Sequence, residues 1–398
     1  MQVPSREVRS CDVAVIGAGV AGTVTAACLA RSGYDVALID AMAVHPPEFR
    51  AEKLGPPQMS LFHTLGAGRS VRAVATPVGA IDVVRYGRIR ERERRREYGF
   101  TYAALVNQLR ADLPSGLALR VGRVESITAG PAGSKVVLTD GSVLSARLVV
   151  VATGLGDAVR RKIGLTRTIV SQRHSLSIGF DLATPLTRFP FEALTYYGET
   201  FGDRVAYLTL FPIEATMRAN LFVYRGPADE WVQAFRTNPL EELAALLPRL
   251  HRFCPDLAMG GPVEVRSMDL VRFEDPARDG IVLVGDAYQT TCPIPGNGIG
   301  KVLVDVERLL TYIPRWLGEP RITRDMVAGY YADPAKASSD ARALQTSLYA
   351  RSIAVEPGGS WRLRRLRNGV ARYALHGLYL AGRRQKQDLA ISGDPVPS

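Results

Sequence analysis

Cysteine and histidine are scarce in this chain. Its 398 residues include five histidines and four cysteines: Cys11, Cys28, Cys254 and Cys292. The cysteines form no CxxC or other paired spacing, which excludes a disulfide framework and a zinc ribbon and indicates a reducing compartment. The histidines show no metal-ligand spacing, so we predict no metal. Cys292 precedes Pro293, and we interpret its thiol as a small buried filler.

Long apolar runs are also absent. No stretch reaches the roughly 18 apolar residues that a membrane-spanning helix needs, and residues 1–10 are polar, without the apolar core of a signal peptide. We therefore predict a cytoplasmic protein. Because 46% of the residues are hydrophobic, a chain of this length can bury the cores of two packed domains.

Acidic residues are fewer than basic ones, 39 against 50, and the formal net charge is +11. The most basic stretch, residues 88–97, interleaves Arg with Glu, a pattern typical of a solvated segment held by salt bridges. Residues 88–97 contain no aromatic residue, whereas stacking on nucleic-acid bases needs aromatic rings interleaved with the basic side chains. We therefore expect no nucleic-acid partner.

A dinucleotide-binding pattern lies near the N-terminus. The apolar run 13–16 predicts a buried strand, residues 20–29 predict a helix rich in small residues, and the turn between them contributes Gly17, Gly19, Val20, Ala21 and Gly22. Glycines there allow a tight turn, a close approach of a pyrophosphate, and packing of helix on strand. The next strand, 36–39, ends at Asp40, whose carboxylate can accept hydrogen bonds from an adenosine ribose.

A second pattern distinguishes FAD from NAD. The apolar strand 281–284 runs into Gly285-Asp286-Ala287, followed by Pro293, Gly296 and Gly298 at the start of a predicted helix. With the N-terminal pattern, this segment resembles the p-hydroxybenzoate-hydroxylase-like family of FAD-dependent aromatic hydroxylases, the class A flavoprotein monooxygenases. The resemblance extends over most of the first 320 residues.

The resemblance implies several contacts to FAD. Asp286 would hydrogen-bond the ribityl chain, and the backbone after Pro293 and around Gly296 to Gly298 would contact the isoalloxazine and the pyrophosphate. Arg50 stands where the family carries an arginine that contacts FAD. A helix N-terminus at that place would stabilise the negative charge of a reduced flavin.

The chain also departs from the family pattern. Thr153 stands where these enzymes carry the acid of an Asp-Gly pair, which makes direct use of NADPH less certain than FAD binding. Tyr102 stands where the return helix carries an arginine, and Gly300 where the family often has Asn. We therefore classify the chain as a divergent member.

The segment between the FAD patterns predicts an antiparallel sheet, because β-branched or aromatic runs at 169–182, 194–198, 205–211 and 217–224 alternate with turns. In the resembled family such a sheet covers the substrate pocket above the flavin. We expect four side chains to line that pocket: Tyr196, Tyr207, Phe211 and Arg218. No general base can be named, so the catalytic residues stay unknown.

The fold class that follows is an α/β FAD-binding Rossmann-like domain of three layers, with an inserted antiparallel-sheet substrate domain and C-terminal helices. We assign 1–75, 98–165 and 275–320 to the FAD-binding domain, and 76–97 and 166–274 to the substrate domain. Residues 321–384 form a helical region and 385–398 a tail. Within that region, 361–381 carries arginines around an apolar stripe, which favours a packed terminal helix and leaves open a peripheral membrane contact.

The predicted function is an FAD-dependent monooxygenase. As the resemblance implies, NADPH or NADH would act as transient donor, O2 would add to the flavin as a C4a-hydroperoxide, and an aromatic or unsaturated small molecule would be hydroxylated. Two alternatives depend on a separate flavin reductase: a flavin-dependent halogenase and a prenyl-chain reductase. A third alternative is a catalytically silent flavoprotein, which Thr153 favours.

Overall fold

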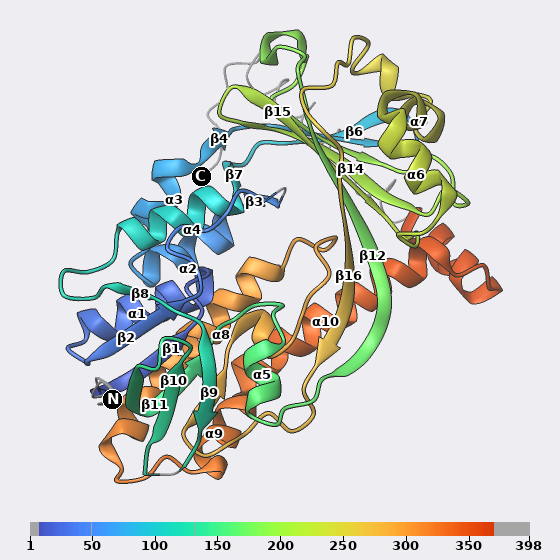
Figure 1. Ribbon diagram of the computed structural model, residues 1–398. Helices are drawn as coiled ribbons and strands as arrows, with labels where there is room; N and C mark the ends of the chain where they lie inside the picture. Colours follow the sequence, from blue (N-terminus) through green and yellow to red (C-terminus); the bar gives the residue numbers. More distant parts are fainter. Residues whose placement is uncertain (1–7, 49, 131, 370–398) are drawn as a thin grey trace, which may run out of the picture.

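The computed structural model describes residues 8–48, 50–130 and 132–369. Figure 1 shows two halves: a parallel sheet with its helices at the lower left, and a long, curved, mostly antiparallel sheet at the upper right. The predicted fold class is confirmed. Within the described ranges, no helix is long and apolar enough to cross a membrane.

The first sheet is built from the apolar runs that the sequence predicted as buried strands. Its order is β8-β2-β1-β11-β10-β9, and β17 pairs with β11 beside that path. Strands β1, β2, β8 and β17 pair in parallel, whereas β9 and β10 are antiparallel. The strands are β1 (Val8–Ile16), β2 (Val36–Asp40), β8 (Leu119–Val121), β9 (Val124–Thr128), β10 (Ser134–Leu138), β11 (Val143–Val151) and β17 (Ile281–Leu283).

Most helices of this half cover one face of the sheet, and the antiparallel strands β9 and β10 with the short helix α5 cover the other. One core joins Val13 and Val15 of β1 to the buried faces of the helices, while Ala14 and Ile16 pack with residues of β9, β10 and α5. The result is three layers. The helices are α1 (Val20–Arg31), α2 (Pro56–Thr64), α3 (Gly68–Val74), α4 (Tyr102–Ala111), α5 (Ala158–Lys162), α8 (Gly298–Gly318) and α9 (Arg324–Tyr331).

The second sheet has the order β16-β12-β15-β14-β13-β5-β6. Helices α6 (Glu230–Thr237) and α7 (Pro239–Leu246) bury one of its faces, and the other face turns toward the parallel half. Its strands are β5 (Ile81–Arg85), β6 (Arg88–Glu93), β12 (Thr168–Leu182), β13 (Ala193–Tyr197), β14 (Val205–Ile213), β15 (Thr216–Val223) and β16 (Glu264–Arg272), with short 3-10 turns η1 (Leu186–Arg188) and η2 (Leu250–Arg252).

The basic stretch predicted as a salt-bridged surface segment forms β6, the edge strand of this sheet. Arg92 pairs with Asp82 on β5, and Arg95 pairs with both Glu93 and Glu97. Two arginines of the stretch, Arg92 and Arg95, are thus paired with acids of the same segment or of the neighbouring strand, as the interleaved pattern indicated.

A small third sheet joins the halves. It contains β3 (Ala51–Leu54), β7 (Glu97–Thr101) and β4 (Thr76–Val78), with β7 in the middle. Asn220 of β15 donates to the carbonyl of Ala51, and the N–H of Glu214 donates to Thr76. The first bond ties the antiparallel sheet to β3, which follows Arg50, and the second ties it to β4.

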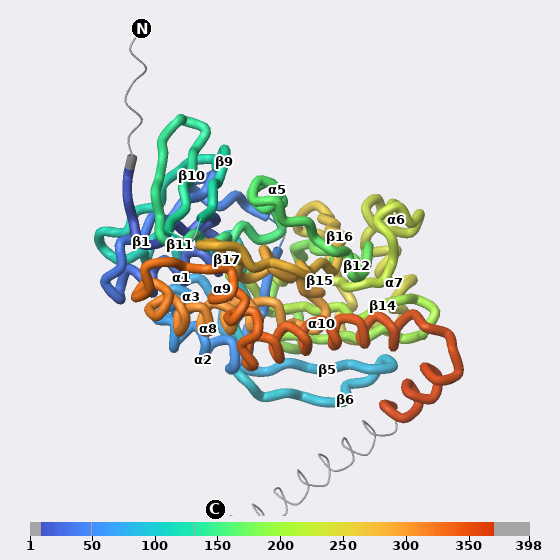
Figure 2. Tube along the Cα trace, turned by 90° about the horizontal axis from the view of Figure 1, so that it is seen from below, coloured from blue at the N-terminus to red at the C-terminus, as the bar shows by residue number. Residues whose placement is uncertain are grey.

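The longest helix of the described residues, α10 (Pro334–Val355), runs from the parallel half to the antiparallel sheet (Figure 2). It packs on α8 at its start and near β14 and β15 further along. His174 of β12 is completely buried there, and one of its ring nitrogens lies 3.1 Å from the carbonyl of Ser347. The predicted membrane-contact segment 361–381 extends beyond the described residues, and the predicted tail 385–398 lies outside them.

Candidate functional site

The first glycine turn connects β1 to α1 and is shaped by the absence of side chains. A Cβ at Gly22 would lie 1.8 Å from the carbonyl oxygen of Gly17, and one at Gly17 would lie 2.5 Å from that of Ala152. Gly17 also has a φ of +100°, a conformation that L side chains rarely adopt. Helix α1 begins at Val20 with no side-chain cap from Gly19 and no acidic residue in its first turn, which favours an anion there, and the N–H of Val20 lies 3.5 Å from the hydroxyl oxygen of Tyr102.

Asp40 and Arg110 hold this turn through hydrogen bonds to the backbone of Ala18. Arg110 was not among the predicted site residues. One oxygen of Asp40 accepts the N–H of Ala18 at 2.7 Å and lies 3.2 Å from the guanidinium of Arg110. Arg110 is buried and also donates to the carbonyl of Ala18 at 2.8 Å. An arginine on the apolar face of the predicted helix after residue 102 was the available signal, since buried charges need partners.

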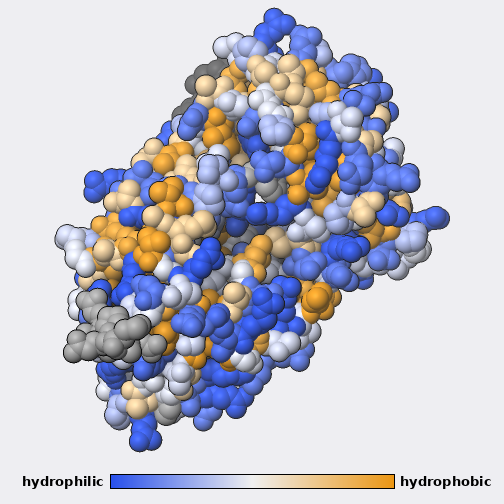
Figure 3. Space-filling model, in the orientation of Figure 1, coloured by the Kyte–Doolittle hydropathy of each residue, from blue (hydrophilic) through white to orange (hydrophobic). Residues whose placement is uncertain are grey.

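A cavity of about 770 Å³ starts at this turn and extends to the second motif. Its walls come from both halves: Arg266 and Ser267 of β16 lie on the side of the antiparallel sheet. Figure 3 shows a hollow between the upper and lower halves, bordered by many hydrophilic residues. The predicted cofactor residues that line the cavity are Gly17, Gly19, Val20, Ala21, Asp40, Arg50 and Asp286.

Arg50 and Tyr102 meet in the wall of the cavity. The guanidinium carbon of Arg50 lies 4.2 Å from the ring centroid of Tyr102, and its Nε lies 2.6 Å from a carboxylate oxygen of Glu52. Tyr102 therefore supplies an aromatic platform for Arg50 at the place where the resembled family carries an arginine. Glu52 also went unnoticed in the sequence, and its charge helps to raise the pKa of Asp286.

The second motif forms the turn η3 (Gly285–Ala287), with Gly285 at a φ of +67°. Burial raises the pKa of Asp286, and the nearby charges of Arg50 and Lys301 oppose that rise. Arg160 of α5, almost fully buried, donates to the carbonyls of Gly154 and Ala287. This arginine, which the sequence reading overlooked, ties the loop after β11 to the turn.

The loop 293–298 leads into α8. Gly296 has a φ of +68°, and a Cβ at Gly298 would lie 3.0 Å from the hydroxyl oxygen of Thr291. Pro293, Gly296 and Gly298 are not among the residues lining the cavity, but Ile299 in the first turn of α8 is. The helix begins with neither an acidic residue nor a side-chain cap in its first turn, which favours a negative charge nearby.

Thr153, Gly154 and Leu155, which follow β11, also line the cavity. The hydroxyl of Thr153 lies 3.4 Å from the carbonyl of Gly156, so it is bonded within its own loop. No carboxylate stands at this place in the loop.

Tyr196, which we predicted to line the substrate pocket, lies on the face of the sheet that is turned away from the cavity. Its side chain is completely buried among the residues that pack against α6 and α7, and its hydroxyl donates to Glu199 at 2.6 Å. Neighbouring strand residues point to opposite faces, so Tyr197 points toward the cavity side instead.

The other predicted substrate residues lie on the cavity side of the sheet but do not line the cavity. Phe211 is buried against Gly99 of β7, in a small apolar cluster. Arg218 lies 3.1 Å from Asp181 and 3.3 Å from Asn220, and Tyr207 donates to the carbonyl of Ile294. Of these three residues, Tyr207 is therefore the one that contacts the loop 293–298.

These features fit FAD. The glycine turn is packed so closely that a Cβ at Gly17 or Gly22 would meet backbone atoms, and it brings the N-terminus of α1, which has no acidic residue, to the cavity, as binding of a pyrophosphate requires. Asp40 stands at the end of β2, at one end of the cavity, and Asp286 stands at the other. In the described part of the chain, no group of three His, Cys, Asp or Glu side chains is arranged to hold a metal ion.

A sequence model described as "FAD binding domain" matches residues 10–318. The chain belongs to this family. The matched segment starts in β1 and ends at the last residue of α8, so it includes both glycine motifs and the antiparallel sheet between them.

Solved structures share the whole fold of this FAD-binding protein. The p-nitrophenol 4-monooxygenase PnpA from Pseudomonas putida DLL-E4 is 17% identical, with a TM-score of 0.70 over 92% of this chain and 94% of that one. A Diels-Alderase of pyrroindomycin biosynthesis is 18% identical, with a TM-score of 0.67 over 93% and 79%. The 2-methyl-3-hydroxypyridine-5-carboxylic acid oxygenase is 22% identical, with 0.63 over 87% and 96%. At these identities the likeness shows the fold alone.

Proposed function

We propose that this protein is an FAD-dependent monooxygenase that hydroxylates an aromatic or unsaturated small molecule. The observation that carries the proposal is the cavity that joins the glycine turn and Asp40 to Arg50 and Asp286 and is closed on one side by β16. The names of two similar structures, a p-nitrophenol 4-monooxygenase and a pyridine-carboxylic acid oxygenase, support this reaction class.

The predicted cofactor residues have different proposed roles. Gly17, Gly19, Val20 and Ala21 would receive the pyrophosphate, and Gly22 would let α1 pack closely on the turn. Asp40 would accept from the adenosine ribose through Oδ1, which accepts the backbone N–H of Met42 and keeps a second lone pair, whereas Oδ2 already meets both the N–H of Ala18 and the guanidinium of Arg110.

At the other end, Asp286 would accept from the ribityl chain and Arg50 would contact the cofactor from its place on Tyr102. Pro293, Gly296 and Gly298 would shape the backbone beside the isoalloxazine. The N-terminus of α8 would stabilise negative charge there.

FAD, when bound, supplies the redox chemistry and the reaction with O2. The protein must exclude water and orient the substrate. Tyr207 is the substrate-side residue that we retain, because its hydroxyl reaches the loop 293–298. Phe211 and Arg218 would act by holding β14 and β15 in place rather than by touching substrate.

The electron donor that we propose is NADPH or NADH. Purified FAD-loaded protein is mixed anaerobically with each donor, with and without a panel of phenols, and the flavin absorbance band is followed. We expect bleaching, and faster bleaching with one class of phenol. If no donor bleaches the flavin, a separate flavin reductase becomes the source of electrons, and chloride-dependent products or prenyl-chain reduction would then identify the halogenase or reductase alternative.

A catalytically silent flavoprotein is the second candidate, because Thr153 replaces the acid at this loop and is bonded internally. Tight FAD binding without any oxidation of NADPH or NADH, with every substrate tested and with an added flavin reductase, would favour this candidate.

We also propose a cytoplasmic location, with membrane contact through 361–381 as an alternative. Vesicle co-sedimentation of the full chain and of a chain ending at residue 360 tests it. Equal recovery of both proteins in the supernatant would exclude the membrane contact.

A further inference from the structure

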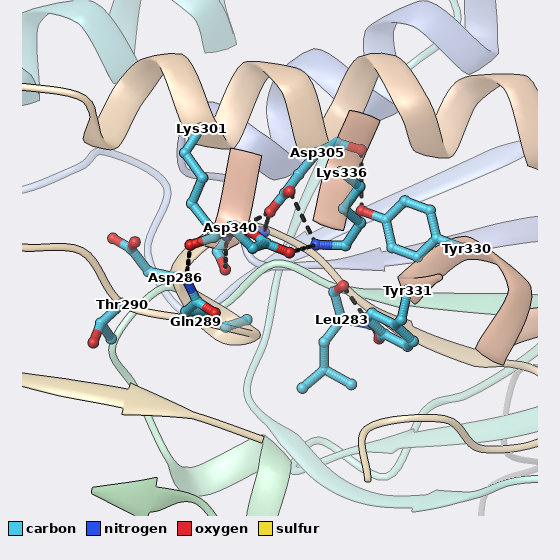
Figure 4. Close-up of polar contacts among 12 residues, drawn as sticks. Leu283, Asp286, Gln289, Thr290, Lys301, Asp305, Tyr330, Tyr331, Lys336 and Asp340 are labelled. Carbon is cyan, nitrogen blue, oxygen red and sulfur yellow. Dashed lines mark hydrogen bonds and ion pairs between the residues drawn. The ribbon is translucent and has the colours of Figure 1, made fainter. Parts of the chain in front are cut away.

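Four charged side chains form a closed cluster directly behind the turn η3. They are Lys301 and Asp305 of α8 and Lys336 and Asp340 of α10, and each is at most 6% exposed. Figure 4 shows them between the two helices, with Asp286 turned away from them. We call these four residues the lysine–aspartate cluster. Its formal charge is zero when all four are ionised.

The contacts within the cluster are short and alternate in sign. Lys301 Nζ lies 2.8 Å from Asp305 and 3.1 Å from Asp340. Lys336 Nζ lies 3.0 Å from Asp305 and 2.8 Å from Asp340. Each ammonium group therefore meets both carboxylates, which is the arrangement that offsets the cost of removing four charges from water.

The cluster also holds the turn itself. One carboxylate oxygen of Asp305 accepts the N–H of Gly285 at 3.0 Å, and Lys301 Nζ lies 3.5 Å from the carbonyl oxygen of Gly285. Gln289, just after the turn, donates to the carbonyl of Asp340 at 2.9 Å. Both ends of the turn are thus bonded to the cluster, while Asp286 between them faces the cavity.

We propose that the lysine–aspartate cluster positions the Gly285–Ala287 turn and sets the electrostatic potential at the flavin, with Lys301 and Asp305 as the two positioning residues. The inference rests on FAD binding and not on the monooxygenase reaction. In a water-poor interior, an uncompensated charge acts over several ångströms. Losing a positive charge behind the turn makes electron uptake by the flavin harder, and losing a negative charge makes it easier.

The experiment measures the midpoint potential of the bound flavin against reference dyes at pH 8, where the carboxylates stay ionised. We expect Lys301→Met to shift the potential to more negative values and Asp305→Asn to shift it to more positive values. The double variant K301M/D305N restores neutrality, and its potential should return close to that of the unchanged protein. Opposite signs and restoration are outcomes that simple loosening of the structure would not produce.

A second measurement separates the hydrogen bond from the charge. Asparagine at position 305 can still accept the N–H of Gly285, whereas leucine cannot. We expect D305L to weaken FAD binding at least tenfold relative to D305N, as measured by recovery of flavin fluorescence on dilution. Equal affinities would overturn the positioning role.

Asp333→Asn is the matched control. Asp333 is also buried and pairs with Arg308 of α8 at 2.8 Å. It caps α10 by accepting the N–H groups of Ala335 and Lys336, which the oxygen of an asparagine can still accept, and its contacts lie away from the turn η3. We expect D333N to leave the potential unchanged. Shifts of the same sign in K301M and D305N, or a shift in D333N as large as theirs, would refute the proposal. Because FAD affinity and potential are measured without turnover, failure of the monooxygenase proposal leaves this test intact.

Discussion

The two halves of the molecule build their share of the site by opposite means. In the parallel half, the glycine turn works because side chains are absent, and a Cβ at Gly22 would collide with the backbone. In the antiparallel half, the site depends on which face of the sheet each side chain occupies, and Tyr196 and Tyr207 lie on different faces. The absence of a side chain is decided at one residue, whereas the face of the sheet on which a side chain lies is decided by how all the strands pair.

The largest effect should come from breaking the parallel half at its turn. Gly22→Ala places a methyl group 1.8 Å from the carbonyl of Gly17, so β1 and α1 must separate. We expect a loss of about 3 kcal/mol or more in the free energy of unfolding, together with loss of FAD, as measured by urea denaturation and flavin absorbance.

Gly329→Ala is the control for that substitution, because a Cβ there meets nothing within 4 Å and the residue lies inside helix α9. It should leave stability unchanged or raise it by about 0.5–1 kcal/mol. A Gly22→Ala protein as stable as this control would show that the turn tolerates a side chain.

The contribution of the antiparallel half can be tested by measuring how stability depends on pH. Burial lowers the pKa of His174 from 6.5 to about 4, so protonation favours the unfolded chain. The stabilisation from the neutral ring is complete above pH 6.5 and is lost as the pH falls toward 4. The difference between these two pKa values corresponds to a change on the order of 3 kcal/mol in the free energy of unfolding.

The measurement for His174 is the free energy of unfolding at pH 7.5 and pH 5, compared between the unchanged protein and His174→Gln. The variant should lose less stability over this interval, because it carries no titrating ring. Equal losses in both proteins would mean that other groups cause the acid sensitivity.

A smaller effect is expected at the end of β2. Asp40→Asn weakens the contact with Arg110 and the hydrogen bond from Ala18 without changing the shape of the side chain. We expect FAD to bind about tenfold more weakly, which corresponds to about 1.4 kcal/mol. Isothermal titration of the apoprotein with FAD checks this, and an unchanged affinity would remove Asp40 from the proposed ribose contact.

The smallest expected effect distinguishes the two faces of the antiparallel sheet. Tyr196→Phe removes a hydrogen bond to Glu199 and should cost about 1 kcal/mol of stability without altering substrate-accelerated flavin bleaching. Tyr207→Phe should alter the bleaching, because its hydroxyl touches the loop 293–298. The reverse pattern would mean that substrate enters from the side of α6 and α7.

Cys292 is a residue whose burial was predicted correctly from its local sequence. It was predicted as a buried filler, and its side chain is completely buried, with burial raising the pKa of its thiol to about 11. Arg110 and Arg160 were missed although both are buried and bond to the turns of the site. The apolar face of its helix is a local signal that Arg110 is buried, but the backbone groups that both arginines bond lie far away in sequence and follow only from the tertiary structure.

The sequence by itself determined the parts of this protein that depend on neighbours along the chain. The glycine turn, the strand ending at Asp40, the Gly285–Asp286 turn and the apolar runs of both sheets follow from local backbone sterics and from hydrophobic periodicity.

Tertiary structure alone decided which residues meet. It placed Tyr196 behind the sheet, stacked Arg50 on Tyr102 and closed Lys301 and Lys336 onto two aspartates from different helices. Strand register and helix packing set these contacts, and both depend on the burial of the whole chain at once.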